Sequence, residues 1–146
     1  MFTLAIVINP EKTHVLMCFH NKQKRWNFIG GKVEPNEAPF DASYRELFEE
    51  TGISRDDITL CFVREENVVC ACYDPWQMFV TAGVLEHSVD LVEEKNKLSW
   101  VKLDDYETIV NGTFGYGNCL MFLREALDAL NLPECMAVTY GNTEEK

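Results

Sequence analysis

The sequence predicts an α+β domain in which a mixed sheet is flanked by helices. Short apolar runs typical of strands dominate the chain, and two longer segments have the spacing of apolar residues that an amphipathic helix requires. One of these helical segments lies between strands and the other follows the last strand, an order that favours helices packed on a sheet. The 146 residues suit one domain, which we expect over residues 1–140, with residues 141–146 as a flexible tail.

The first half of the chain is predicted to form a hairpin, a turn-rich segment and a helix. Apolar runs at residues 2–8 and 14–19 are separated by the turn-forming stretch NPEKT, which indicates two paired strands. Residues 26–37, WNFIGGKVEPNE, are rich in glycine and turn formers and suit a structured loop or short strands. A helix over residues 39–51 follows, because a proline fits its first turn and a glycine comes directly after its end.

The second half is predicted to contain four strands and to end in a helix. Residues 119–132, CLMFLREALDALNL, have leucines at helical spacing, and Asn118 before them is a suitable N-cap. Residues 104–110 are compatible with a short helix. Apolar and β-branched runs indicate strands at residues 58–65, 68–73, 77–85 and 98–103.

Composition narrows the class of protein. Hydrophobic residues at 47% and aromatic residues at 12% exclude a disordered chain, and no apolar run approaches the roughly 18 residues of a membrane span. The six cysteines lie in apolar segments without a CxxC pair and are expected to be reduced and mostly buried, a redox or metal role being the alternative. No basic leader precedes the first predicted strand. We therefore expect a soluble, cytoplasmic protein with no membrane partner, as a monomer or homodimer.

The net charge of −11 opposes binding of a nucleic acid polymer, which depends on clustered lysine and arginine. It does not exclude a small phosphate-containing substrate. Such a substrate would need divalent cations at the site to offset electrostatic repulsion.

Three glutamates near the end of the predicted helix over residues 39–51 suggest where such cations bind. Glu46, Glu49 and Glu50 share one helical face, at the end where the helix dipole disfavours anions. Like charges four residues apart cost roughly 0.2–0.5 kcal/mol. Because Mg²⁺ prefers oxygen ligands, bound metal would turn this unfavourable cluster into a binding site. The alternative is a merely solvated acidic face.

The surrounding residues carry a resemblance to a known family. The string GKVEPNEAPFDASYRELFEETGI, residues 31–53, is similar at every fixed position to the Nudix hydrolase signature, G-x5-E-x7-R-E-U-x-E-E-x-G-U, where U is bulky and apolar. We call this string the Nudix box and its helix the box helix. The resemblance implies a Nudix-type α/β/α sandwich with a mixed central sheet, the box helix and a C-terminal helix. The matching positions are Gly31, Glu37, Arg45, Glu46, Leu47, Glu49, Glu50, Gly52 and Ile53.

The resemblance also implies roles for individual residues. Glu46 would activate the attacking water, while Arg45 and Glu37 would orient the metal-binding loop and helix. Gly31 and Lys32 are candidates for substrate binding. The ligands of Mg²⁺ or Mn²⁺ would be Glu46, Glu49, Glu50 and the carbonyl of Gly30.

An acidic residue before a late tryptophan-containing strand often completes the site in this family. Here that strand is LSWVKL, and we expect Glu94 to be the additional ligand, with Glu93 as the rival and a solvated loop carboxylate as the alternative.

Two positions depart from the pattern of many members. Asn36 replaces a glycine, and asparagine tolerates a left-handed backbone, so the turn should be preserved. Ile29 replaces a proline, which makes RWNFIGG similar to the oxidised-purine nucleotide hydrolases of the family. By that resemblance Asn27 would contact the base, the alternative being that it satisfies backbone groups of its own loop. Asn118 could supply a second polar contact to the base or act only as an N-cap.

The resemblance implies a reaction in which water attacks a phosphorus of a nucleoside diphosphate linked to another group. We expect a purine (d)NTP such as 8-oxo-dGTP, which would yield the monophosphate and pyrophosphate. Trp76, Met78, Phe79 and Tyr116 could wall a base pocket or belong to the core. The alternatives are a dinucleoside polyphosphate, a nucleotide sugar or ADP-ribose as substrate, or a non-catalytic nucleotide-sensing module.

Overall fold

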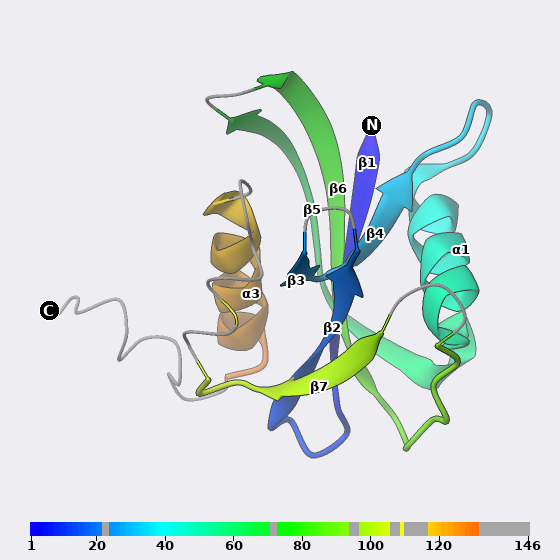
Figure 1. The fold of residues 1–146 in the computed structure, drawn as a ribbon, viewed down its shortest axis with the longest axis vertical. Helices are drawn as coiled ribbons and strands as arrows, with labels where there is room; N and C mark the ends of the chain where they lie inside the picture. Colours follow the sequence, from blue (N-terminus) through cyan, green and yellow to red (C-terminus); the bar gives the residue numbers. More distant parts are fainter. Residues whose placement is uncertain (22–23, 71–72, 94–96, 106–108, 110–116, 132–146) are drawn as a thin grey trace, which may run out of the picture.

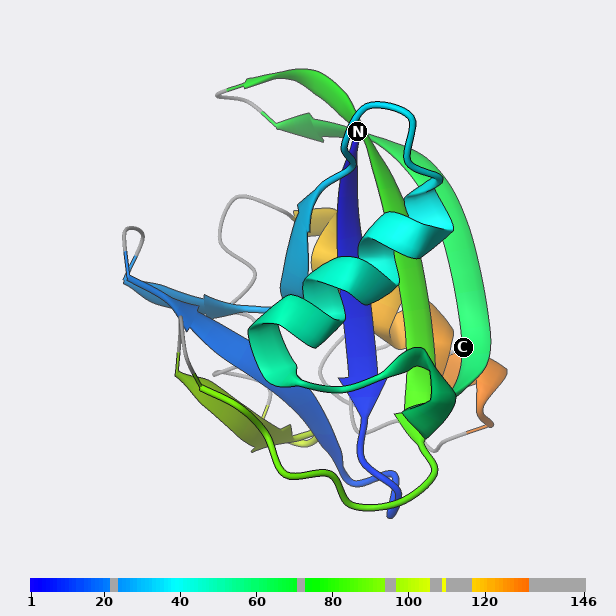
Figure 2. The same ribbon diagram turned by 90° about the vertical axis from the view of Figure 1, so that its right-hand side faces the viewer.

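The computed structural model describes residues 1–21, 24–70, 73–93, 97–105, 109 and 117–131. A mixed sheet lies between two helices, one on each face (Figures 1 and 2). The predicted α+β sandwich is thereby confirmed. In the described part of the chain no helix is long and apolar enough to cross a membrane. The elements in chain order are β1 (Phe2–Ile8), β2 (His14–His20), β3 (Arg25–Asn27), β4 (Ile29–Lys32), α1 (Pro39–Thr51), the 3-10 helix η1 (Arg55–Asp57), β5 (Ile58–Cys70), β6 (Tyr73–Leu85), β7 (Leu98–Lys102) and α3 (Gly117–Ala129).

The sheet is built around β1. Its central path runs in the order β3-β2-β1-β6-β5, with β4 paired to β1 and β7 paired to β2. The β1–β6 pair is parallel, and the other pairs are antiparallel. This arrangement brings the glycines of β4 alongside β1, with Gly31 opposite Thr3 and Gly30 opposite Leu4.

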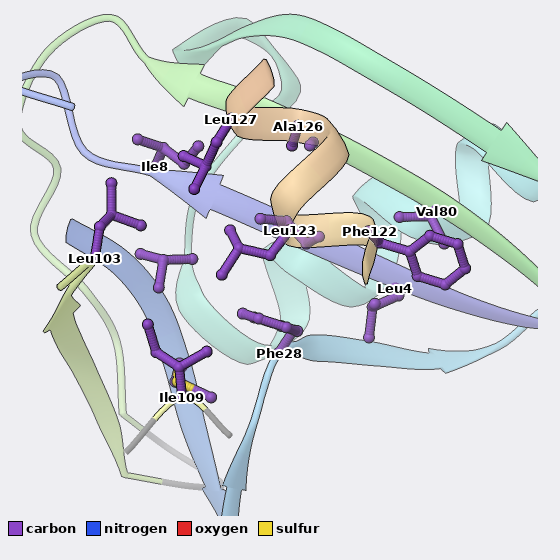
Figure 3. Packing of buried hydrophobic residues seen from close by; sticks show 14 of the residues in the cluster. Leu4, Ile8, Phe28, Val80, Leu103, Ile109, Phe122, Leu123, Ala126 and Leu127 are labelled. Carbon is purple, nitrogen blue, oxygen red and sulfur yellow. The ribbon is translucent and has the colours of Figure 1, made fainter. Parts of the chain in front are cut away.

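Two hydrophobic cores form because side chains of a strand alternate between the faces of the sheet. Leu4, Ile6 and Ile8 of β1 face α3, whereas Ala5 and Val7 face α1. Figure 3 shows the α3 side, where the helix packs against the strands. The labelled residues of this core are Leu4, Ile8, Phe28, Val80, Leu103, Ile109, Phe122, Leu123, Ala126 and Leu127.

The box helix has the predicted bounds, Pro39–Thr51, and Gly52 ends it with a left-handed φ of 81°. Tyr44 and Leu47 are buried in the core on the α1 side. Ser43 is hydrogen-bonded to Thr81 of β6, at 3.0 Å between the two hydroxyl oxygens. This contact face fixes the rotation of α1 about its axis, and hence the direction in which its glutamates lie.

Three predictions of element boundaries are wrong. The two strands expected over residues 58–65 and 68–73 form one strand, β5, and Tyr73 already belongs to β6. The polar residues Glu66 and Asn67 do not break the ladder, because β6 pairs with them through backbone groups. Asn118 is not the N-cap of the last helix, since α3 begins at Gly117.

Other boundaries differ slightly or are not covered. The last helix ends at Ala129, β2 extends to His20 and β7 ends at Lys102. Most of the predicted short helix over residues 104–110 and all of the predicted tail over residues 141–146 lie outside the described residues.

Leu47→Ala is expected to destabilise the protein by about 2–5 kcal/mol, because it leaves a cavity under the box helix. The Leu47 side chain is only 1% exposed. The free energy of unfolding from urea titrations tests this. Phe48→Ala is a matched control on the same turn. Because Phe48 is 59% exposed, this substitution should change the free energy of unfolding by roughly 0.5 kcal/mol or less. Equal losses in the two variants would contradict the prediction.

Candidate active site

Arg45 is the centre of a polar network at the junction of the box helix and the loop before it. Its Nε and one terminal nitrogen donate to the two carboxylate oxygens of Glu37, at 2.7 and 3.1 Å. The same terminal nitrogen donates to the carbonyl of Lys32 at 3.0 Å. Such a two-pronged arginine–carboxylate pair fixes geometry as well as charge. The network therefore attaches the end of β4 and the loop to the first half of the box helix.

Arg45 also faces two of the box carboxylates. Its other terminal nitrogen lies 3.4 Å from Glu46 Oε1 and 3.3 Å from Glu49 Oε1. The Glu46 side chain is 16% exposed, compared with 42% for that of Glu49. One guanidinium thus offsets part of the repulsion among these glutamates and leaves Glu46 as the more enclosed carboxylate.

Gly31 is in contact with Glu46. A Cβ atom at position 31 would lie 1.4 Å from Glu46 Oε2, so only a glycine leaves room for this carboxylate. Gly30 is constrained differently, because a Cβ there would lie 2.3 Å from the backbone oxygen of Thr3 in β1. The paired glycines therefore have separate tasks: Gly30 allows close strand pairing, and Gly31 admits the Glu46 carboxylate.

Glu50 faces a third direction, toward β2. Burial raises the pKa of the Cys18 thiol to about 12, and the negative charge of Glu50 contributes to the rise. Cys18 is fully buried, as predicted for the cysteines, and stays a neutral thiol. Alternation along β2 could have predicted which face Cys18 occupies, but no signal in the sequence indicated that Glu50 lies near it.

The three box glutamates do not form a closed metal cage. Within the described part of the chain, no group of three or more His, Cys, Asp or Glu side chains is arranged to hold a metal ion. Mg²⁺ is usually held by one or two carboxylates together with waters and substrate phosphates, so a closed protein cage is not required. A half-enclosed Glu46 beside the backbone of the paired glycines fits such a partly liganded ion.

Of the two candidates for an additional acidic ligand, the structure describes Glu93 but not Glu94. Glu94 lies outside the described residues. Its rival Glu93 is described, and its Oε2 accepts a hydrogen bond from the backbone N–H of Leu98 at 2.7 Å. This hydrogen bond ties the Glu93 side chain to the first residue of β7.

Asn27 is the last residue of β3, which pairs with β2 and directly precedes the glycine-containing strand β4. Its side chain is buried, with 4% exposed, and it is paired across the sheet with Cys18. Its Oδ1 accepts a hydrogen bond from the backbone N–H of Phe28 at 2.8 Å, which is the backbone-satisfying role given above as an alternative. Because Oδ1 accepts this bond, the other group of the amide, Nδ2, is the one suited to donate to a ligand.

The remaining predicted substrate residues are less informative. Lys32 is exposed, and its ammonium lies 6.0 Å from the centre of the Phe2 ring, while its carbonyl serves Arg45. Asn118 lies in the first turn of α3. The left-handed turn expected at Asn36 is confirmed by its φ of 65°.

The predicted aromatic wall does not form as a unit. Met78 is buried in the core on the α3 side, whereas the ring of Phe79 lies 5.7 Å from that of Phe40 on the α1 side. Neighbouring residues of a strand point to opposite faces, so these two cannot line one pocket. Tyr116 lies outside the described residues, and the side chain of Trp76 is likewise not described. A hollow of about 260 Å³ near His14 and Trp100 contains none of the predicted site residues.

The hydrogen bonds from Arg45 make the stability of the fold at acidic pH depend on the protonation of Glu37. Hydrogen bonds from the Arg45 side chain, and then from the Glu34 backbone, lower the pKa of Glu37 below its ordinary value. A carboxylate with a lowered pKa stabilises the fold above its unfolded-state pKa of about 4.3, and this contribution is lost as the pH falls through the folded-state value.

Glu37→Gln is therefore expected to be less stable than the wild type near neutral pH and to lose less stability on acidification. Urea midpoints measured from about pH 7 down to about pH 3 test this. Parallel curves for the two proteins would contradict the prediction.

Comparison with known proteins agrees with the geometry. The profile of the family described as NUDIX domain matches residues 2–118. The m7GpppN-mRNA hydrolase dcap-2 of Caenorhabditis elegans is 31% identical over 118 residues, covering 71% of this chain and 14% of the relative. An RNA pyrophosphohydrolase of Pseudomonas putida is 39% identical over 57 residues, covering 39% of this chain and 36% of the relative. The chain thus spans well under half the length of these curated relatives.

Solved structures show the same fold. An Ap4A hydrolase of C. elegans superposes with a TM-score of 0.68 at 17% identity, covering 89% of this chain and 93% of that one. The mutator MutT protein of Bacillus halodurans superposes with a TM-score of 0.57 at 26% identity, covering 74% and 72% of the two chains.

Proposed function

The chain belongs to the Nudix family, and from this membership we propose that it hydrolyses a phosphoric anhydride bond of a purine nucleoside triphosphate. The products would be the nucleoside monophosphate and pyrophosphate. Nudix enzymes generally use divalent metal ions, and we propose Mg²⁺ or Mn²⁺ here. The ligands would come from Glu46, Glu49, Glu50 and the carbonyl of Gly30.

The observation that carries this proposal is the position of Glu46. Its carboxylate is held between the guanidinium of Arg45, at 3.4 Å, and the backbone of Gly31. Arg45 is in turn held by both oxygens of Glu37. A merely solvated acidic face would not require a glycine facing one carboxylate or an arginine fixed by four partners. The arrangement supports a carboxylate kept in one orientation for a reaction.

The chemistry follows from that orientation. A bound divalent cation would lower the pKa of a water and offset the charge of the substrate phosphates. Glu46 would accept the proton of the attacking water as the water oxygen forms its bond to phosphorus and the bond to the leaving pyrophosphate oxygen breaks. Arg45 and Glu37 would act as positioning residues, because their hydrogen bonds and ion pairs hold Glu46 and the loop.

Preference for a purine is supported by Asn27. Its Nδ2 group is a donor, and guanine presents two acceptors, N7 and O6, on one edge. Asn27 lies in the strand directly preceding the paired glycines, so the proposed base contact and the proposed metal site come from neighbouring segments of the chain.

A second candidate substrate is the 5′ end of an RNA. The two relatives described above are named as an m7GpppN-mRNA hydrolase and an RNA pyrophosphohydrolase, and a 5′-triphosphorylated RNA end presents the same polyphosphate chemistry as a nucleoside triphosphate. The net charge of −11 disfavours extended contacts with the RNA backbone, so contact would be limited to the terminal nucleotides.

A substrate panel with Mg²⁺ tests the proposal and separates the two candidates. The panel contains purine and pyrimidine (d)NTPs, 8-oxo-dGTP, a dinucleoside polyphosphate, a nucleotide sugar, ADP-ribose and a 5′-triphosphorylated RNA oligonucleotide. Release of pyrophosphate from a purine (d)NTP at the highest kcat/KM supports the first candidate, and preference for the RNA supports the second. No turnover of any member by the full chain would overturn the assignment as an enzyme.

Asn27→Asp should raise KM for purine substrates about tenfold while leaving that for pyrimidines nearly unchanged. Aspartate keeps the oxygen that accepts from Phe28 N–H but has no donor, and one such hydrogen bond is worth about 1.4 kcal/mol. Steady-state kinetics with matched purine and pyrimidine triphosphates measures the effect. Equal changes for both bases would rule out Asn27 as a base-reading residue.

A further inference from the structure

We propose that Glu93 is a positioning residue, which holds the end of the box helix in register with the strands that carry Asn27. The proposal rests on the function proposed above and assigns Glu93 a role other than metal ligand. Three sets of contacts lead from the box helix through Glu93 to Asn27.

The first set joins the end of the box helix to the segment just before Glu93. The backbone N–H of Val92 donates to the carbonyl of Thr51, the last residue of α1, at 2.9 Å. A Cβ at Gly52 would lie 3.0 Å from Val92 Cγ2, so the two residues are in close contact. Leu91 packs against the core on the α1 side. The chain just before Glu93 is therefore attached to the helix that carries the catalytic glutamates.

The second set joins Glu93 to the start of β7. Glu93 Oε2 accepts a hydrogen bond from the backbone N–H of Leu98 at 2.7 Å. One residue earlier, the carbonyl of Lys97 accepts from the N–H of Phe19 in β2 at 2.8 Å. The Glu93 carboxylate thereby connects the helix-bound segment to the point where β7 meets β2.

The third set reaches the proposed substrate. Leu98 is paired with Cys18 of β2, and Cys18 is paired on its other side with Asn27 of β3. Asn27 is therefore a direct neighbour of the β2 position that Glu93 helps to hold. If the Glu93 bond is lost, the helix end and the β2–β3 pair can move relative to each other.

An isosteric substitution that removes the charge separates this role from metal binding. Glutamine keeps an oxygen that can accept from Leu98 N–H, but it is a much poorer ligand than a carboxylate. A positioning role thus predicts that Glu93→Gln behaves like the wild type and Glu93→Ala does not. A ligand role predicts that both variants lose metal affinity.

The experiment compares Glu93→Ala and Glu93→Gln with the wild type by three readouts. These are Mn²⁺ affinity by electron paramagnetic resonance, exchange of the Leu98 and Phe19 amide protons by NMR, and kcat on the preferred panel substrate. Glu86→Ala is the matched control, because Glu86 is also exposed and also accepts one 2.7 Å bond, from Thr59 Oγ1. It should leave Mn²⁺ affinity, kcat and the exchange of both amides unchanged.

For Glu93→Ala we expect faster exchange of both amides, Mn²⁺ affinity about threefold to tenfold weaker and kcat about tenfold lower, since small misplacements of reacting groups cost rate. For Glu93→Gln we expect values within about twofold of the wild type. Equal loss of Mn²⁺ affinity in both variants would show that Glu93 is a ligand and overturn the proposal, as would wild-type behaviour of Glu93→Ala. If no panel substrate is turned over, the proposed function fails while metal affinity and amide exchange still decide the role of Glu93.

Discussion

Glu46→Gln is expected to lower kcat about a thousandfold with the fold intact, because the amide cannot accept the proton of the attacking water. It also loses the negative charge that would hold a divalent cation. Glutamine has the same shape as glutamate, so the contact with Gly31 survives and the thermal midpoint should stay close to that of the wild type. Single-turnover kinetics at saturating Mg²⁺, with circular dichroism on the same samples, measures both quantities.

Glu49→Gln provides the comparison for this result. Glu49 lies on the same helical face but is 42% exposed, and its carboxylate contacts Arg45 at 3.3 Å. We expect its main effect to be a higher Mg²⁺ concentration at half-maximal rate rather than a loss of kcat at saturation. Near-normal kcat in Glu46→Gln, or equal kcat losses in the two variants, would rule out a special role for Glu46.

The second large effect is expected for Gly31→Ala, which should lower kcat about a hundredfold. The added Cβ would overlap Glu46 Oε2, at 1.4 Å, so the carboxylate must leave its position. A displacement of about 1 Å in a reacting group can cost this factor. The backbone at Gly31 does not have a left-handed φ, and the overlapping atom ends a flexible side chain, so stability should change little.

Gly30→Ala is the matched control at the adjacent position. Its Cβ would lie 2.3 Å from the carbonyl oxygen of Thr3, and a backbone group in a strand cannot move away without disturbing the β1–β4 pairing. We expect a loss of about 1–3 kcal/mol in the free energy of unfolding. Gly31→Ala with wild-type kcat, or with the same loss of stability as Gly30→Ala, would show that the glycine does not serve the Glu46 carboxylate.

Much of the fold was predictable where the evidence was local. The box helix was predicted with its observed bounds, because proline, apolar spacing and glycine act within a few residues of one another. The left-handed conformation at Asn36 was predictable for the same reason. Prediction failed where segments far apart in the sequence determine the local structure. Strand β5 continues through Glu66 and Asn67 because β6 pairs with them.

For the site, the sequence by itself indicated which residues we propose to carry the chemistry, because the spacing of the Nudix box is a property of one continuous segment. The contact of Glu49 with Arg45 lies within one helix, four residues apart, and follows from the sequence spacing. Only the tertiary structure decided what Glu46 and Glu50 face: Glu46 lies against Gly31, and Glu50 lies near Cys18. The physical reason is that these neighbours are brought together by packing of α1 on the sheet, through contacts such as Ser43 with Thr81. Contacts between residues so far apart along the chain leave no periodicity in the sequence.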